Sequence, residues 1–98
     1  MPTAKGKLDL AIIRRVVRRH LNEVRFCYER ILVKSPGLGG VVVTKFVIGK
    51  EGTVLSATAD GVNPEVSSCI AGRIMTWEFP KPATGIVSVV FPFTLAPP

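Results

Sequence analysis

The stretch GVVVTKFVIGKEGTVLSATA, residues 40–59, decides the fold of this chain. Most of residues 41–48 are β-branched or aromatic, which is typical of a strand, and residues 53–59 resume that pattern after a short glycine-containing turn. We therefore expect an antiparallel hairpin. Alternation along its first strand divides the side chains between two faces, with Val42, Thr44, Phe46 and Ile48 on one and Val41, Val43, Lys45 and Val47 on the other.

A long amphipathic helix is expected upstream of the hairpin. Asp9 can accept a hydrogen bond from the first free amides as the N-cap, and Leu8 can pack on Ile13 as a hydrophobic staple. The KSPG sequence at residues 34–37 ends the helix. Its apolar side chains recur at three- and four-residue spacing, at Leu10, Ile13, Val17, Leu21, Val24, Tyr28 and Ile31.

A second helix is expected after the hairpin. Asn63, Pro64 and Glu65 supply an N-cap, a proline at the first helical position and an acidic side chain in the first turn. Proline cannot continue a helix, so the FPKP sequence at residues 79–82 ends this one. Its buried stripe comprises Val66, Ile70, Ile74 and Trp77, with Cys69 at the edge of the stripe.

The sequence GIVSVVFPFTL, residues 85–95, alternates as a final strand does. Because proline donates no backbone hydrogen bond, Pro92 predicts that this strand lies at the border of the sheet. We expect residues 86–90 to form a free edge with which another strand can pair, and we expect that pairing to end or bulge near Phe91 and Pro92. The order of elements is helix, strand, strand, helix, strand.

Length and composition indicate a single globular domain over residues 1–98. Hydrophobic residues make up 47% of the chain and charged residues 20%, with a net charge of +6. No apolar run is long enough to span a membrane, and the first ten residues lack the apolar centre of a signal peptide. We expect residues 1–7 to be flexible and the domain to come from a longer, membrane-anchored protein.

The segment RRVVRRH, residues 14–20, raises the question of an anionic partner. Its arginines fall off the apolar stripe of the predicted helix, and spacings of four predict pairs between Arg19 and Glu23 and between Arg25 and Glu29. The arginines lack the stacking aromatics or second recognition helix of a nucleic-acid binder, so no nucleic-acid partner is expected. Phe26 lies on the same side and is either covered by a bend or loop or, as a candidate secondary docking surface, exposed with Arg15, Arg19 and Arg30.

The chain offers little for catalysis, so we expect no enzyme, no catalytic residue, no metal and no cofactor. His20 and Cys27 are seven residues apart on one helix, about 10 Å along its axis, which is too far for the imidazole to activate the thiol. A metal site built from His20, Cys27 and Cys69 lacks a fourth ligand. A further alternative is that the arginine flank binds an anionic partner, such as nucleic acid, lipid or a peptidoglycan-associated polymer. Such binding would weaken as salt rises, whereas strand addition would change little.

Cys27 and Cys69 can form a bridge, remain two buried free thiols, or act as a redox pair. Redox pairs usually have short spacing such as C-x-x-C, and 42 positions separate these two. We favour the bridge in an oxidising compartment, because one cysteine lies on each predicted helix and both helices cover one face of the sheet. Such a bridge would hold the helices together under a pulling force.

Residues 40–95 resemble the C-terminal domain of TonB and its relatives. The resemblance rests on four segments in order, which are GVVVTKFVI (40–48), EGTV (51–54), WEF with the following KP (77–82), and GIV (85–87). The sequence RRVVRRHLNEVRFCYE, residues 14–29, together with a second cysteine in the next helix, resembles the tail domain of AgmX-type gliding-motility proteins of myxobacteria. The chain lacks the tyrosine–proline pair that precedes the short first helix of TonB.

The resemblance implies an α+β fold, with two helices packed on one face of a three-stranded antiparallel sheet. It also implies a periplasmic module of an inner-membrane-anchored protein, which takes up an extended peptide of an outer-membrane or periplasmic protein beside its last strand. Through the parent chain the module would transmit force from an inner-membrane proton-driven motor, as in gliding motility or TonB-like energy transduction. The predicted peptide-binding edge comprises Gly85, Ile86, Val87, Ser88, Val89, Val90 and Phe91.

A different function remains open. The second face of the predicted sheet carries more apolar side chains than a solvated face should, so a homodimer that covers this face or edge is an alternative to peptide binding. The apolar side chains in question are Val41, Val43, Val47, Ile86 and Val90.

Overall fold

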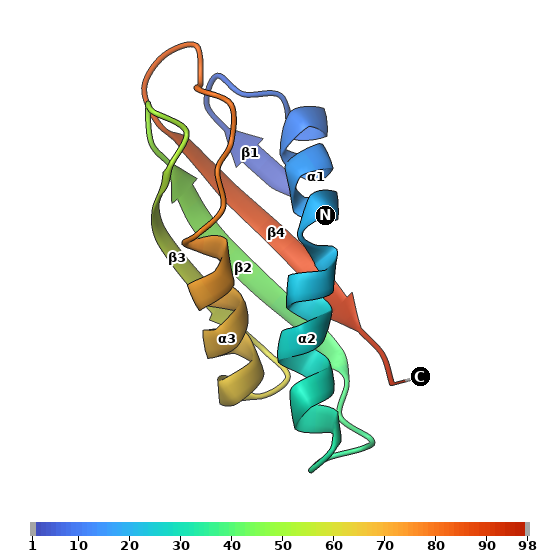
Figure 1. The fold of residues 1–98 in the computed structure, drawn as a ribbon. Helices are drawn as coiled ribbons and strands as arrows, with labels where there is room; N and C mark the ends of the chain where they lie inside the picture. Colours follow the sequence, from blue (N-terminus) through green and yellow to red (C-terminus); the bar gives the residue numbers. More distant parts are fainter. Residues whose placement is uncertain (1, 98) are drawn as a thin grey trace.

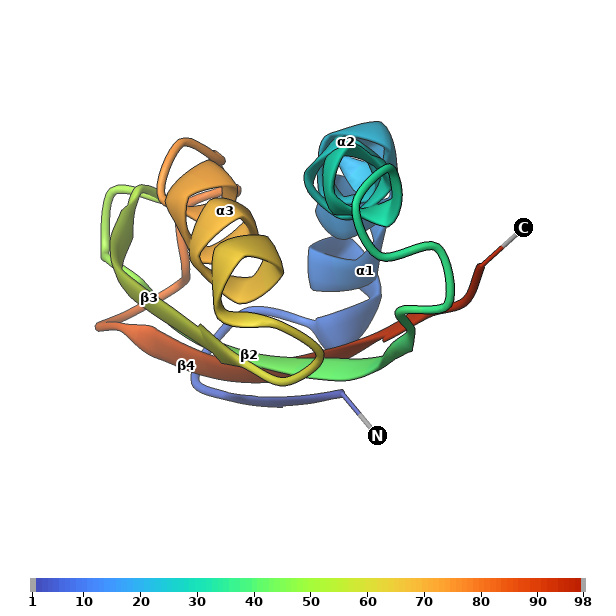
Figure 2. The same cartoon turned by 90° about the horizontal axis from the view of Figure 1, so that it is seen from below.

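Three helices lie on one face of a four-stranded antiparallel sheet in the computed structural model, which describes residues 2–97 (Figures 1 and 2). The molecule is elongated, with extents of 44 × 21 × 20 Å. The α+β class is as predicted, whereas the sheet has one strand and the helical layer one helix more than expected. The elements are β1 (Thr3–Lys5), α1 (Leu10–Arg19), α2 (Leu21–Leu32), β2 (Gly40–Ile48), β3 (Val54–Asp60), α3 (Pro64–Ile74) and β4 (Val87–Leu95).

The strands lie in the order β1-β4-β2-β3. β2 and β3 form the predicted hairpin, with a bulge between Val47 and Ile48. β2 and β4 pair along their whole length, from Gly40 opposite Leu95 to Ile48 opposite Val87. On the β2 side this register is continuous and contains no bulge at Pro92.

The alternation predicted for β2 is confirmed. Val42, Phe46 and Ile48 are buried under the helices, and Val41 and Val43 point to the open face. The buried Thr44 donates its hydroxyl to the carbonyl of Phe91 at 2.7 Å, which satisfies its polar group inside the core. The core therefore forms between the helical layer and one face of the sheet.

The single helix predicted for residues 10–31 is wrong, because the chain breaks at His20 into α1 and α2. Asp9 caps α1 as predicted, since its carboxylate accepts a hydrogen bond from the Ala11 amide at 2.9 Å. Apolar spacing did not reveal the break because both helices keep the same face on the sheet. Val17 before the break and Val24 after it are each 2% exposed.

The N-cap of α3 is confirmed, but its predicted end is wrong. The Asn63 side chain accepts hydrogen bonds from the amides of Glu65 and Val66 at 2.7 and 3.3 Å. The helix ends at Ile74, and Trp77 lies in the turn that follows, still 1% exposed. Burial of Trp77 therefore arises from the position of the turn rather than from helical periodicity.

The turn of the β2–β3 hairpin is tied to the segment after α3. The amide of Phe79 donates to the carbonyl of Gly52 at 2.9 Å, and Thr53 forms a β-bridge with Glu78. Gly52 has a φ of +88°, and a Cβ there would lie 2.1 Å from the Phe79 carbonyl oxygen. Only glycine fits this close approach.

The predicted disulfide is confirmed: Cys27 of α2 is bonded to Cys69 of α3, with 5.6 Å between the Cα atoms. The bridge links the two helices that lie side by side above the sheet (Figure 2). By chain entropy alone, closing a loop of this length stabilises the folded state by about 4 kcal/mol. Within residues 2–97, no helix combines the length and the hydropathy needed to cross a membrane.

Residues 1–7 were expected to be flexible, and part of this segment forms a strand. Thr3–Lys5 form β1, which pairs with β4, while Met1 lies outside the described residues. The TAK sequence of β1 has no strand signal of its own. Its conformation comes from pairing with β4, which a local sequence pattern cannot reveal.

Candidate functional site

The predicted peptide-binding edge is only partly free. β4 begins at Val87, so Gly85 and Ile86 precede the strand. The predicted free border is wrong over Ser88–Val90, because β1 pairs there, with Thr3 opposite Val90 and Lys5 opposite Ser88. The physical reason is local: a proline removes a hydrogen-bond donor at its own position, and β1 pairs upstream of Pro92.

Several contacts hold the β1 segment against β4. Ala4, opposite Val89, is half-buried and packs against the core, whereas Thr3 and Lys5 are exposed. Gly6 has a φ of +140°, and a Cβ there would lie 2.7 Å from the carbonyl oxygen of Ile86. Further along, the carbonyl of Lys7 accepts a hydrogen bond from the Ala83 amide at 3.1 Å. Glycine at position 6 thus permits the close approach of the two chains.

β1 covers three of the nine residues of β4. Within the described residues, Phe91–Leu95 have a ladder partner on the β2 side but none in β1. A hollow of about 210 Å³ lies next to this part of β4 and is lined by Tyr28, Leu32 and Leu95 among others. The far part of the β4 border therefore offers both unpaired backbone and a recess for a side chain.

β3 forms the opposite border of the sheet. Among the described residues its ladder partner is β2 alone, over a strand of seven residues. Near this border Leu55 and Ile86 are 58% and 55% exposed, and both line a largely apolar hollow of about 340 Å³. The sequence predicted the open border at the last strand, so β3 was not predicted as a binding edge.

The residues of the candidate docking surface on the helices lie together only in part. Phe26 is 52% exposed, so neither a bend nor a loop covers it. The guanidinium carbons of Arg30 and Arg73 lie 5.8 and 5.9 Å from the centre of its ring. Arg73 comes from α3 and was missed, since nothing in the sequence brings it next to Phe26. Arg15 and Arg19 belong to α1, beyond the helix break.

The ion pairs predicted along the helix are wrong. Among residues 2–97 the ion pairs are those between His20 and Glu23 and between Lys81 and Glu51. Glu23 turns away from Arg19 because His20 and the Trp77 side chain hold its carboxylate. The arginine side chains of α1 and α2 therefore face solvent with their charge unpaired.

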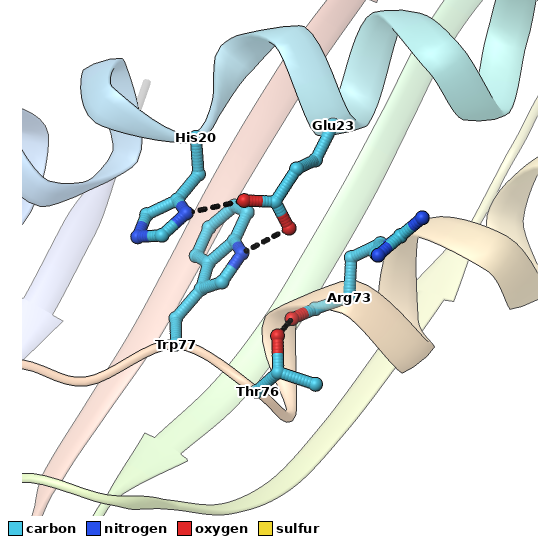
Figure 3. A network of polar contacts seen from close by, with 5 residues as sticks. All are labelled: His20, Glu23, Arg73, Thr76 and Trp77. Carbon is cyan, nitrogen blue, oxygen red and sulfur yellow. Dashed lines mark hydrogen bonds and ion pairs between the residues drawn. The ribbon is translucent and has the colours of Figure 1, made fainter.

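His20, Glu23 and Trp77 form the polar network of the helix break (Figure 3). The imidazole stacks on the indole with 4.8 Å between ring centres, and its Nδ1 lies 2.5 Å from Glu23 Oε2. The indole N–H donates to Glu23 Oε1 at 3.2 Å. Below them, the Thr76 hydroxyl donates to the Arg73 carbonyl at 2.7 Å and closes the end of α3.

The pKa of the Glu23 carboxyl reflects this network. Burial by itself raises this pKa. The hydrogen bonds from His20 and Trp77 and the charges of His20 and Arg73 act in the opposite direction and outweigh burial, so the pKa is lowered from its ordinary value of 4.5. Glu23 is thus held as a carboxylate that joins the helix break to the turn after α3.

His20 and the two cysteines take part in separate contacts, not in a shared catalytic or metal-binding arrangement. Cys27 is bonded to Cys69, and the His20 ring is held by Glu23 and Trp77. In the part of the chain that the structure describes, no three His, Cys, Asp or Glu side chains are grouped so as to hold a metal ion. What the geometry offers instead is backbone at the β4 border and an exposed aromatic flanked by arginines.

Comparison with family models, with curated proteins and with solved structures found no match to this chain. The function is therefore inferred from the two surfaces just described, together with the sequence segments that resemble TonB.

Proposed function

We propose that this chain is a protein-interaction module that receives an extended segment of a partner alongside β4. One observation carries this proposal: a segment of the chain itself, β1, already lies on that border in antiparallel register with Ser88–Val90. The outer edge of β4 is therefore competent to pair, and β1 displays the geometry that an added strand would adopt.

The length of β4 favours a longer ligand than β1. β1 uses three residues of a nine-residue strand, and Phe91–Leu95 have no partner on that side among the described residues. An extended partner could pair further along β4, where the recess between α2 and Leu95 can take an alternate side chain. Because Pro92 has no N–H, backbone pairing there would rely on carbonyl acceptors and on the neighbouring residues.

We place the module in the periplasm, as part of a TonB-like or gliding-motility machine. The resemblance of residues 40–95 to the TonB C-terminal domain supports this setting, and so does the Cys27–Cys69 disulfide, since such bonds persist in oxidising compartments. The parent chain would connect the module to an inner-membrane proton-driven motor, and the bound segment would belong to an outer-membrane or periplasmic protein. The bridge between α2 and α3 would then keep the helical layer intact under load.

A second candidate function is self-association through the open face of the sheet. Val41 and Val43 are 48% and 38% exposed on this face, and Ile86 is exposed near its end. Covering these side chains would remove apolar surface from water. Analytical ultracentrifugation separates the two functions: a monomer at high protein concentration contradicts the dimer, whereas a dimer abolished by Val41→Thr together with Val43→Thr supports it.

Peptide binding is tested by nuclear magnetic resonance on the oxidised, isotope-labelled chain. The probes are overlapping synthetic peptides that cover the periplasm-facing segments of outer-membrane proteins from the same cell. The proposal predicts that amide shifts from a binding peptide concentrate on β4 and persist at high salt. Shifts confined to β3 would contradict the assigned border, and salt-sensitive shifts confined to Arg14–Arg30 would assign binding to the helices instead.

A further inference from the structure

We propose that β1 is an internal occupant of the partner's place on β4, and that a partner segment carries the pattern found in β1 and the residue after it, namely a small apolar residue, any residue, and then glycine. This inference rests on the proposed function and specifies the ligand class and the regulation of the same site. In the chain itself the pattern is Ala4, Lys5 and Gly6.

The glycine requirement follows from Gly6. The antiparallel register, continued by one residue beyond Lys5 opposite Ser88, brings Gly6 opposite Val87. A Cβ at position 6 would lie 2.7 Å from the Ile86 carbonyl oxygen and 2.8 Å from a methyl carbon of Val87. Its φ of +140° is also one that residues with side chains rarely adopt. Any strand that follows the same path therefore needs glycine at this point.

The small apolar residue follows from Ala4. Directly opposed residues of an antiparallel pair project to the same face, so Ala4 shares the helix-covered face with Val89. Val89 is 1% exposed, and Ala4 packs against the same core. A bulky side chain would overpack this position, and a charged one would lose its hydration there. Thr3 and Lys5 are exposed and leave the neighbouring positions unrestricted.

The short ladder of β1 makes it replaceable. β1 forms a pairing of three residues, and one half-buried alanine supplies its apolar contact with the core. A partner that pairs with more of β4 would form additional hydrogen bonds, but it must compete with a strand that is covalently attached and thus present at high effective concentration. A partner can bind only molecules in which β1 has left β4. Because these molecules are a small fraction of the total, the apparent affinity of the partner is lower than its intrinsic affinity.

The test uses full-length oxidised chains in which β1 is dislodged. Gly6→Ala introduces the Cβ that the Ile86 carbonyl excludes, and Gly37→Ala is the matched control, because a Cβ at Gly37 meets no atom within 4 Å. Ala4→Lys is a second dislodging variant, with Thr3→Lys as its control at an exposed position. Consecutive amides of a strand alternate between its two neighbours, so we expect the amides of Ser88–Val90 that point toward β1 to exchange at least tenfold faster in both dislodged variants than in the wild type and the controls, whereas those that point toward β2 stay protected.

The probe is the peptide PTAKGKL, which copies residues 2–8. It should bind the Gly6→Ala and Ala4→Lys chains at least tenfold more tightly than the wild type or the two controls, and it should restore slow exchange at the amides of Ser88–Val90 that point toward β1. Within the peptide, Gly6→Ala or Ala4→Trp should each weaken binding at least tenfold, whereas Lys5→Thr should have little effect.

Two outcomes would overturn the inference: equal affinity of the peptide for wild-type and dislodged chains, or full affinity of the peptide that carries Gly6→Ala. The proposed function fails separately. In one outcome, PTAKGKL occupies β4 in the dislodged chains while no segment of a periplasmic or outer-membrane protein does. That result would support β1 as the internal occupant of β4 and contradict the proposal that the chain receives a partner segment. If such segments bind wild-type and dislodged chains equally and need no glycine, the chain does receive partner segments, but β1 does not occupy their place.

Discussion

The imidazole of His20 stacks on the indole of Trp77, with 4.8 Å between ring centres and 16° between ring planes, although 57 residues separate them in the chain. His20 lies at the break between α1 and α2, and Trp77 lies in the turn after α3. Glu23 accepts hydrogen bonds from the indole and contacts the imidazole, so the three side chains connect the two halves of the helical layer.

Replacing Trp77 should destabilise the domain strongly. The side chain is 1% exposed, and truncation of a buried aromatic residue to alanine costs about 3–5 kcal/mol. Trp77→Phe retains much of the packing but loses the hydrogen bond to Glu23, so it should cost less than Trp77→Ala. Urea unfolding of the two variants checks the order. A loss under about 1 kcal/mol for Trp77→Ala would contradict the role of this residue as a core anchor.

Acid should remove the contribution of Glu23 to stability. The pKa of its carboxyl is lowered in the folded state, so the carboxylate stabilises the fold at pH above its ordinary value of 4.5, and this stabilisation is lost as the pH falls through the lower, folded-state value. Urea unfolding of the wild type and Glu23→Gln between pH 7 and pH 3 measures it. The difference in free energy of unfolding should be constant at neutral pH and shrink in acid. A difference that grows in acid would contradict the direction of the pKa shift.

The disulfide between Cys27 and Cys69 should contribute a large part of the stability. For a loop closed across 42 positions, removing the bridge is expected to cost about 4 kcal/mol by chain entropy. Cys27→Ala combined with Cys69→Ala removes the bridge without leaving a free thiol, and chemical denaturation against the oxidised wild type measures the loss. A double variant as stable as the wild type would show that packing alone holds α2 on α3.

Two glycines should respond in opposite directions to alanine. Gly52→Ala places a Cβ 2.1 Å from the Phe79 carbonyl oxygen at a φ of +88°, so the turn must open and stability should fall by more than about 1 kcal/mol. Gly72 lies exposed in α3 with no atom within 4 Å of an added Cβ, so Gly72→Ala should stabilise by about 0.5–1 kcal/mol. Thermal unfolding of both variants measures the signs. Equal effects would contradict the contact between the hairpin turn and the segment after α3.

Elements with strong local signals were predictable from the sequence. The β2–β3 hairpin follows from β-branched residues around a glycine turn, and the caps Asp9 and Asn63 mark the starts of their helices. The disulfide could be predicted because both cysteines lie on helices that cover one face of the sheet.

Features that depend on contacts distant in sequence were not predictable. The break at His20 leaves the apolar spacing unchanged, and the partner that holds it, Trp77, is 57 residues away. β1 has no strand signal, and its presence alters the candidate site by covering Ser88–Val90. Arg73 joins Phe26 only because α3 lies beside α2. Pro92 restricts backbone pairing at its own position, and the prediction of a free border was wrong because it extended this restriction to Ser88–Val90.

Contacts at Val89 show most directly whether a partner segment takes the place of β1 on β4. In the free chain, nuclear Overhauser effects should connect the Hα atoms or side chains of Ala4 and Val89, which oppose each other across the ladder. With a saturating partner segment, these contacts should disappear, and contacts between the segment and Val89 should replace them. Persistent Ala4–Val89 contacts in the complex, with the segment elsewhere on the molecule, would contradict the replacement of β1 by the partner.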